Sequence, residues 1–209
     1  LGKVMKGLGS GNVDFRPRQT DFGTDFKRAG TPWLGLKLAE IKDLDAALVV
    51  GSFLRKDHPL IAQRLRQAAK KYTKVSLLSV GGEDNLIRLH ARLTVAPSAL
   101  AQSLAAVVKA AAELKGIAAP AGLESIGPCE TSKAIAQSLL EGDKRAIFLG
   151  NVATQCADAT QLHALALELG KLTKASVGFL GEAANTVGGH AGWALPTGAN
   201  ARTMFEQPR

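Results

Sequence analysis

An apolar run that ends in glycine, followed at once by a helical pattern, occurs twice in this chain. The first run reads AALVVG at residues 46–51, and the second reads RAIFLG at residues 145–150. A continuous apolar run of this length is typical of a strand that is buried on both faces of a parallel sheet. Because such a sheet needs helices on both faces, the two runs favour an α/β fold.

Each run predicts a strand–helix–strand unit. After the first run, Pro59 stands where a first helical residue is expected, and apolar residues recur at helical spacing from Ile61 to Tyr72. The apolar runs VSLLSV at residues 75–80 and ASVGFL at residues 175–180 close the two units. We therefore expect two Rossmann-like, doubly wound units with a mainly parallel sheet.

The chain divides into three segments on this interpretation. Residues 1–37 lack a clear hydrophobic period and are expected to form an irregular opening segment. Residues 38–125 are expected to form the first α/β unit, and residues 126–209 the second α/β unit with a Gly-rich tail. Within the first unit, residues 88–95 favour another strand, and the Ala-rich residues 98–116 favour a helix.

A further helix is predicted at residues 129–143 of the second unit. Thr131 or Ser132 is expected to cap its N-terminus, because a hydroxyl oxygen can accept a hydrogen bond from a free backbone N–H there. Gly142 is expected to end the helix.

The formal net charge of +8 is concentrated near one predicted helix. Between Arg55 and Lys74 there are seven Lys or Arg residues and one acid, Asp57, and most of these cations fall on the helix predicted at residues 59–72. A solvated helix face is one interpretation, and contact with an anion or a partner protein is the other. Nucleic-acid binding is not expected, because only 5% of the residues are aromatic and no stacking platform accompanies the cations.

Metal binding and membrane insertion are not expected from the sequence. The two cysteines, Cys129 and Cys156, cannot supply a zinc or iron–sulfur site by themselves, because such a site needs about four ligands. The four histidines show no pair at metal-binding helical spacing. No apolar run approaches the roughly 18 residues that a membrane span needs, so we expect a soluble chain without direct membrane insertion.

Ligands of open α/β sheets bind where loops leave the carboxyl ends of the strands, so residues 51–58 and 150–155 are the expected pocket rims. Neither turn contains a G-x-G-x-x-G or Walker A phosphate motif. The alternating glycines of residues 7–12 follow no predicted strand, and no G-x-S-x-G nucleophile motif is present. The sequence therefore predicts no catalytic residue.

Four stretches of the chain resemble the large iron–sulfur subunit of bacterial NADH:quinone oxidoreductase, respiratory complex I. These stretches are GSGNVDFRPRQTDF (9–22), LVVGSFLRKDHPLIAQRLRQAAKKYTKVSLLS (48–79), IFLGNVATQ (147–155) and FLGEAANTVGGHAGWALP (179–196). The resemblance is most specific at EAANTVGG and LRKDHPL, and it implies a central fragment of that subunit. More broadly, both units are similar to the molybdopterin-dependent oxidoreductases, such as formate dehydrogenase.

The comparison with the molybdenum enzymes implies that three cofactor contacts have been lost. Thr20 stands where those enzymes place the Cys or selenocysteine that ligates the metal, and Phe53 stands where an Asn helps to hold the pterin dinucleotide. Ser79, Val80 and Gly81 replace an Asp-Pro-Arg sequence that contacts the guanosine. No cofactor or metal is therefore expected at the degenerate pocket rim, which consists of Thr20, Gly51, Ser52, Phe53, His58, Ser79, Gly150 and Asn151.

The resemblance implies a scaffold role. In complex I the clusters of this subunit are held by cysteines that lie mainly in an N-terminal portion, so the iron–sulfur clusters belong to the parent subunit and not to this segment. Its implied partners are other subunits of the peripheral arm, on the cytoplasmic side of the inner membrane. Two alternatives remain open: a molybdopterin- or nucleotide-binding oxidoreductase fragment, and a basic domain that binds nucleic acid.

Overall fold

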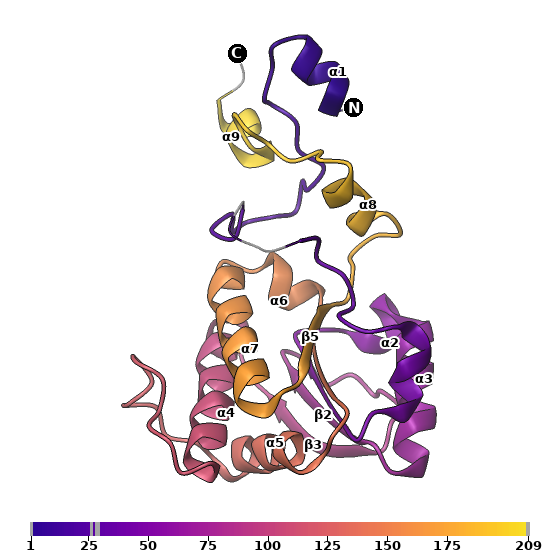
Figure 1. The fold of residues 1–209 in the computed structure, drawn as a ribbon, viewed down its shortest axis with the longest axis vertical. Coiled ribbons are helices and arrows are strands. Elements are labelled where there is room, and N and C mark those ends of the chain that lie inside the picture. Colours follow the sequence, from indigo (N-terminus) through magenta and orange to yellow (C-terminus); the bar gives the residue numbers. More distant parts are fainter. Residues whose placement is uncertain (1, 26, 28–29, 208–209) are drawn as a thin grey trace.

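A five-stranded sheet, in which every neighbouring pair of strands is parallel, forms the centre of the computed structural model (Figure 1). The structure describes residues 2–25, 27 and 30–207. The strand order is β3-β2-β1-β4-β5, with β1 at Ala46–Val50, β2 at Lys74–Ser79, β3 at Leu89–Thr94, β4 at Arg145–Leu149 and β5 at Ser176–Phe179. The predicted α/β fold with a parallel sheet is confirmed.

The two strand–helix–strand units contribute to one sheet, because β1 pairs with both β2 and β4. The division of the chain into three segments remains a prediction. Side chains along β1 alternate between the two faces of the sheet, and both faces are buried, so the sequence of β1 is apolar throughout. Leu48 and Val50 belong to the core on one face of the sheet, whereas Ala47 and Val49 belong to the core on the other face.

Different helices cover the two faces of the sheet (Figure 1). One face packs against α4 (Leu100–Leu114), α5 (Glu130–Glu141) and α7 (Ala159–Thr173). The other face packs against α3 (Pro59–Lys71) and the 3-10 helix η1 (Leu38–Asp43). The remaining helices are short: α1 (Gly2–Gly7), α2 (Leu54–Asp57), η2 (Pro97–Ala99), α6 (Asn151–Gln155), α8 (Thr186–Ala191) and α9 (Ala201–Glu206).

The helix α5 has a different cap from the one that the sequence suggested. Its N-cap is Cys129, whose Sγ accepts a hydrogen bond from the backbone N–H of Ser132 at 3.4 Å. The prediction that Thr131 or Ser132 caps the helix was wrong, because α5 already begins at Glu130, before either hydroxyl side chain. Gly142 follows the last residue of α5, as predicted.

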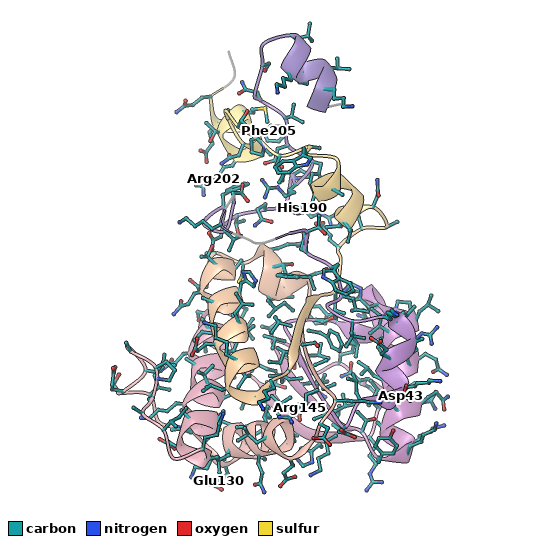
Figure 2. The ribbon with its side chains drawn as sticks, viewed as in Figure 1. Asp43, Glu130, Arg145, His190, Arg202 and Phe205 are labelled. Atoms are coloured by element: carbon teal, nitrogen blue, oxygen red, sulfur yellow. The ribbon has the colours of Figure 1, made fainter. Side chains whose placement is uncertain are left out.

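The two terminal segments pack together, away from the sheet (Figure 1). The backbone N–H groups of Thr197 and Gly198 both donate to the carbonyl of Gly11 at 3.1 Å. Figure 2 shows His190, Arg202 and Phe205 in this part of the molecule, and Glu130 and Arg145 at the opposite end. Within the described residues, no helix is both long enough and apolar enough to cross a membrane.

Candidate functional site

The carboxyl ends of β1 and β4 lie side by side at the centre of the sheet. From β1 the chain continues through α3 to β2 on one side, and from β4 it continues through α7 to β5 on the other side. Helices α3 and α7 cover opposite faces. This reversal of direction is the switch point, where open α/β sheets usually bind their ligands.

The two turns at the switch point are packed directly against each other. Gly51 has a φ of +60°, and a Cβ atom placed on it would lie 2.7 Å from the backbone nitrogen of Ala153. A Cβ atom placed on Gly150 would lie 2.4 Å from the Cβ of Ser52. The N–H of Val152 donates to the carbonyl of Gly51 at 2.9 Å. Backbone atoms of the chain itself therefore fill the space between the ends of β1 and β4.

The phenyl ring of Phe53 covers the next position along the sheet, at the end of β2. A Cβ atom placed on Gly81 would lie 3.0 Å from Cε1 of this ring, so the ring is in contact with the backbone of Gly81. The hydroxyl of Ser79 donates to the carbonyl of Gly81 at 3.2 Å. Phe53 and Ser79, where the sequence resemblance predicts lost cofactor contacts, are thus engaged within the protein.

Thr20 joins the opening segment to α6. Its hydroxyl donates a hydrogen bond to the carbonyl oxygen of Gln155 at 2.5 Å. The next residue, Asp21, accepts a hydrogen bond from the backbone N–H of Thr160 at 2.6 Å, in the first turn of α7. Burial raises the pKa of Asp21, but hydrogen bonds from Gly23 and Thr160 outweigh burial and lower it overall. Thr20 and Asp21 therefore fix this segment to the helices that follow β4.

Three polar atoms near the switch point make no hydrogen bond of normal geometry with another described residue. They are Ser52 Oγ, His58 Nε2 and Asn151 Oδ1, and all three are buried. Burial is the main cause that lowers the pKa of His58, while the charge of Asp57 and a side-chain interaction with Asn151 oppose it, so the His58 and Asn151 side chains interact with each other. A buried polar atom without a partner costs about 1 to 3 kcal/mol, so Ser52 Oγ favours a small polar ligand or a water at this position.

A cavity of about 570 Å³ lies beside the switch point, over the carboxyl ends of β4 and β5. It is bounded by the opening segment and by α8, which approach each other from the two ends of the sequence. Its aromatic lining includes two ring pairs with centroids 5.1 Å apart, Phe15 with His190 and His163 with Phe179. No sequence pattern predicted this cavity, because the opening segment and α8 that bound it are more than 150 residues apart.

Arg16 lines the same cavity, but its guanidinium already forms ion pairs within the protein. Its guanidinium donates to Asp14 Oδ1 at 2.8 Å and to the two carboxylate oxygens of Asp25 at 2.6 and 2.8 Å. Burial alone would lower the pKa of Arg16, but the hydrogen bonds to Asp25 and Asp14 outweigh it and raise this pKa. Only 8% of the side chain is exposed. Arg16 therefore organises the opening segment, and its charge is already neutralised.

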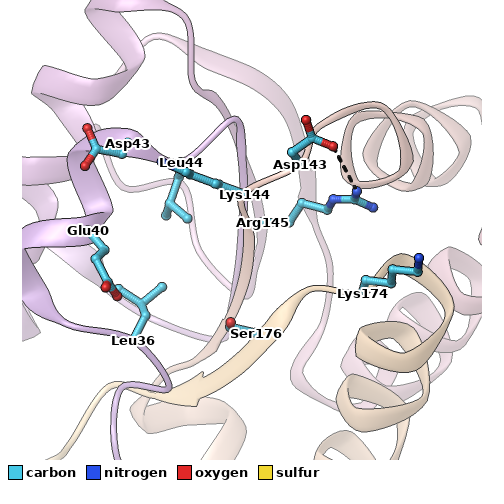
Figure 3. A pocket seen from close by; sticks show the side chains of 9 residues that line it. All are labelled: Leu36, Glu40, Asp43, Leu44, Asp143, Lys144, Arg145, Lys174 and Ser176. Atoms are coloured by element: carbon cyan, nitrogen blue, oxygen red, sulfur yellow. Dashed lines mark ion pairs between the residues drawn. The ribbon is translucent and has the colours of Figure 1, made fainter.

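A second cavity, of about 340 Å³, lies at the amino ends of the strands, on the opposite edge of the sheet (Figure 3). The Nη1 atom of Arg145 donates to the backbone carbonyls of Leu139 and Thr173, and its Nη2 atom lies 4.0 Å from Asp143. Three cations and three carboxylates line this cavity: Glu40, Asp43, Asp143, Lys144, Arg145 and Lys174. The balance of charge indicates no preference for an anion or a cation.

Residues 1–206 match the family model described as molybdopterin oxidoreductase. The chain belongs to this family. A comparison with curated proteins found no match. Among solved structures, this molybdopterin oxidoreductase domain is similar to a chain of the formyltransferase/hydrolase complex from Methylorubrum extorquens, which was solved in complex with methylofuran. The two chains are 19% identical with a TM-score of 0.46, and the match covers 74% of this chain and 41% of that chain, so this chain spans less than half of its length.

The side chains of this molybdopterin oxidoreductase domain do not fit the molybdenum cofactor at the positions that the sequence comparison identified. Thr20 offers a hydroxyl whose hydrogen is already donated to Gln155, and Phe53 can neither donate nor accept a hydrogen bond. Within the described residues, no group of three or more His, Cys, Asp or Glu side chains could hold a metal ion. The buried polar atoms of Ser52, His58 and Asn151 are the part of the rim that still offers hydrogen bonds.

Proposed function

We propose that this domain is the central scaffold portion of the large iron–sulfur subunit of NADH:quinone oxidoreductase. In this role it supports electron transfer from NADH to quinone without binding a cofactor itself. The iron–sulfur clusters belong to other parts of the parent subunit. The partners of the domain are other subunits of the peripheral arm, on the cytoplasmic side of the inner membrane.

One observation carries the proposal: the space between the ends of β1 and β4 is occupied by the two turns themselves. Gly51 is packed against Ala153, and Gly150 is packed against Ser52, with no room for a single additional methyl group at either glycine. Opening this space for a dinucleotide would require the two turns to separate, which would break the hydrogen bond from Val152 to Gly51. Protein interiors resist such changes because they are closely packed.

The sequence resemblance supplies the specific assignment to complex I. LRKDHPL spans α2 and the start of α3, and EAANTVGG spans residues 182–189 before and within α8. Glu182, the first residue of the second motif, forms an ion pair of 3.1 Å with Arg18 of the opening segment. Both motifs therefore lie in segments that connect structural elements of the fold, and this is consistent with a scaffold role.

The proposal is tested on the full-length subunit, purified within its complex. We expect no molybdenum by elemental analysis and no fluorescent pterin after oxidation, while the preparation oxidises NADH with quinone. Molybdenum or pterin at one equivalent per subunit would contradict the scaffold role. Purification of the chain without any NADH:quinone oxidoreductase subunit would contradict the assignment to complex I.

A second candidate is a molybdopterin- or nucleotide-binding oxidoreductase fragment, and one observation favours it. The buried Ser52 Oγ, His58 Nε2 and Asn151 Oδ1 atoms, none with a hydrogen bond of normal geometry, lie on the loops where a dinucleotide would bind. This function predicts calorimetric heat on titration with GDP or NAD, and roughly tenfold weaker binding for Asn151→Ala than for the exposed control Gln63→Ala. Absence of heat with both nucleotides would exclude nucleotide binding.

A further inference from the structure

The outward face of α3 and the last turn of the preceding helix α2 carry exposed cations. We call Lys56, Arg64, Lys70 and Lys71 the basic stripe. All four side chains are exposed, and none forms an ion pair with another described residue. The opposite face of α3 is buried in the core through Ala62, Leu65, Ala68 and Ala69. The stripe therefore follows directly from the amphipathic pattern of the helix.

Three other helices pair exposed cations with acids of the same helix, whereas the short α1 carries Lys3 and Lys6 without an acidic residue. Lys133 on α5 pairs with Glu130 at 2.9 Å, and Lys171 on α7 pairs with Glu168 at 3.1 Å. On α9, Arg202 pairs with Glu206 at 2.8 Å. Helix α3 contains no acidic residue at all. In this respect α3 differs from α5, α7 and α9 and resembles only the short α1 among the helices compared.

The helix dipole accounts for only part of the basic stripe. Lys70 and Lys71 lie in the last turn of α3, where cations are stabilised by the partial negative charge of that end. Arg64 lies in the middle of α3, where the dipole has little effect, whereas Lys56 lies in the last turn of α2, beside Asp57. Intramolecular electrostatics therefore does not explain the position of Arg64.

Apolar side chains mark the two ends of this face. Leu60 is 75% exposed and Tyr72 is 58% exposed. They are twelve residues apart, which corresponds to about 18 Å along a helix. Figure 1 shows α2 and α3 at the side of the molecule, with no other segment outside them. The basic stripe thus lies between two exposed apolar side chains on an uncovered helix.

We propose that the basic stripe, together with Leu60 and Tyr72, docks an acidic protein segment of a neighbouring subunit. Carboxylates of that segment pair with Lys56, Arg64, Lys70 and Lys71, and its apolar side chains contact the two ends of the face. The inference rests on the proposed scaffold function and adds the partner's chemistry to it. Because the cations are exposed, they contribute mainly to the rate and specificity of association, and the contact is sensitive to salt.

A protein fits this face better than the other polyanions do. Nucleic acid without sequence preference is held by aromatic stacking as well as by charge, and Tyr72 is the only aromatic side chain on α3 and its cap. An anionic membrane would need a continuous apolar face for insertion, whereas Gln63, Arg64 and Gln67 separate Leu60 from Tyr72. An acidic segment uses both features of the face, the charge and the two separate apolar contacts.

The first test uses the intact complex and a carbodiimide, which joins a lysine amine to a carboxylate that touches it. We expect cross-links from Lys56, Lys70 or Lys71 to Asp or Glu of another subunit, located by mass spectrometry. The same lysines should be acetylated several-fold more slowly in the complex than Lys171 of α7, which is 75% exposed and serves as the control. Equal acetylation of Lys70, Lys71 and Lys171 would overturn the docking.

The second test reverses charge in the full-length subunit. We expect the double variant Arg64→Glu with Lys71→Glu to bind its neighbour roughly tenfold more weakly, with the loss growing at low salt. The control is Lys3→Glu with Lys6→Glu on α1, which changes the net charge equally and should leave assembly intact. An equal loss in both double variants, or wild-type assembly of the α3 variant, would overturn the proposal.

Two further outcomes separate this inference from the function on which it rests. If the subunit co-purifies with complex I while the stripe lysines remain fully accessible, the docking fails and the scaffold function stands. If the subunit does not co-purify with complex I, both fail. Binding of the wild-type domain to single-stranded RNA or to anionic vesicles, abolished by the α3 double variant without any effect on assembly, would also overturn the acidic protein partner.

Discussion

Asp45 and Lys144 are joined by a reciprocal pair of hydrogen bonds at the amino edge of the sheet. The backbone N–H of Asp45 donates to the carbonyl of Lys144 at 2.7 Å, and the backbone N–H of Lys144 donates to the Asp45 carboxylate at 2.9 Å. These residues immediately precede the paired strands β1 and β4. The contact therefore fixes the register of the pair whose other end forms the switch point.

The Asp45 contact predicts a stability difference that depends on pH. Hydrogen bonds from the backbone N–H groups of Lys144 and Asp143 lower the pKa of Asp45. The stabilisation is therefore fully present above the ordinary carboxyl pKa of about 3.9 and is lost as the pH falls through the lower pKa of the folded state.

We expect Asp45→Ala to lower the free energy of unfolding by about 1 to 2 kcal/mol at neutral pH. Urea denaturation at pH 7, 5 and 3 measures the difference between the two proteins, which should shrink at the lowest pH. Asp45→Asn keeps one acceptor oxygen and should lose less stability than Asp45→Ala. A difference that stays constant down to pH 3 would show that the carboxylate charge does not matter.

The strands were predictable from sequence because the information is local. The apolar run of β1 and the helical spacing of α3 lie within single short windows, and the glycines that end β1 and β4 mark the turns. The merging of the two units into one sheet follows from the pairing of β1 with β4, which are about a hundred residues apart. No local pattern encodes such a pairing.

The candidate site was predictable only as a set of positions. The positions of Gly51 and Gly150 follow from the strand–turn–helix pattern, but their packing against Ala153 and Ser52 depends on how two distant turns meet. The hydrogen bond between Thr20 and Gln155 and the cavity beside β5 also depend on contacts between distant segments, so no local pattern predicts them. The cap at Cys129 was not predicted for a different reason. Sulfur is a weak hydrogen-bond acceptor, so the nearby hydroxyl side chains of Thr131 and Ser132 were the expected caps.

The packing of the two turns predicts that three glycines differ in their tolerance of alanine. Gly51 combines a positive φ with a contact to Ala153, Gly150 has only the contact to Ser52, and Gly116 has only a positive φ of +67°. We expect Gly116→Ala to lower stability by about 1 kcal/mol, because strain acts alone there. Gly150→Ala should cost about 1 to 3 kcal/mol through overpacking, and Gly51→Ala should cost the most.

Chemical denaturation of the three glycine variants, with circular dichroism as the signal, gives the order. If Gly150→Ala were as stable as the wild type, the turns would be able to move apart. That result would weaken the argument that the switch point is closed to ligands.

Burial of His58 predicts a loss of stability on acidification. Burial lowers the pKa of His58, so the unfolded chain binds a proton more readily than the folded chain does. Stability therefore falls as the pH drops below the ordinary histidine pKa of about 6.5, until the pKa of the folded state is passed. The His58→Gln variant should lack this loss of stability on acidification, so its free energy of unfolding should vary less between pH 7 and pH 5 than that of the wild type.

The matched control is His90→Gln, because His90 is exposed and lies on β3 away from the switch point. When the free energy of unfolding is measured by urea denaturation at each pH, His90→Gln should keep the loss of stability on acidification that the burial of His58 causes. If the two variants lost the same pH dependence, the effect would not come from the burial of His58.

The two cysteines are predicted to differ in reactivity, because the thiolate is the reactive form. The side-chain hydrogen bond with Ser132 lowers the pKa of Cys129, which is exposed at the N-terminus of α5, whereas burial raises the pKa of Cys156. Iodoacetamide at pH 7.5 should therefore alkylate Cys129 first, by roughly tenfold or more in rate. Peptide mass spectrometry over time measures both rates, and Ser132→Ala should slow the reaction of Cys129 while leaving Cys156 unchanged. Equal rates for the two thiols in the wild type would mean that the cap does not stabilise the thiolate.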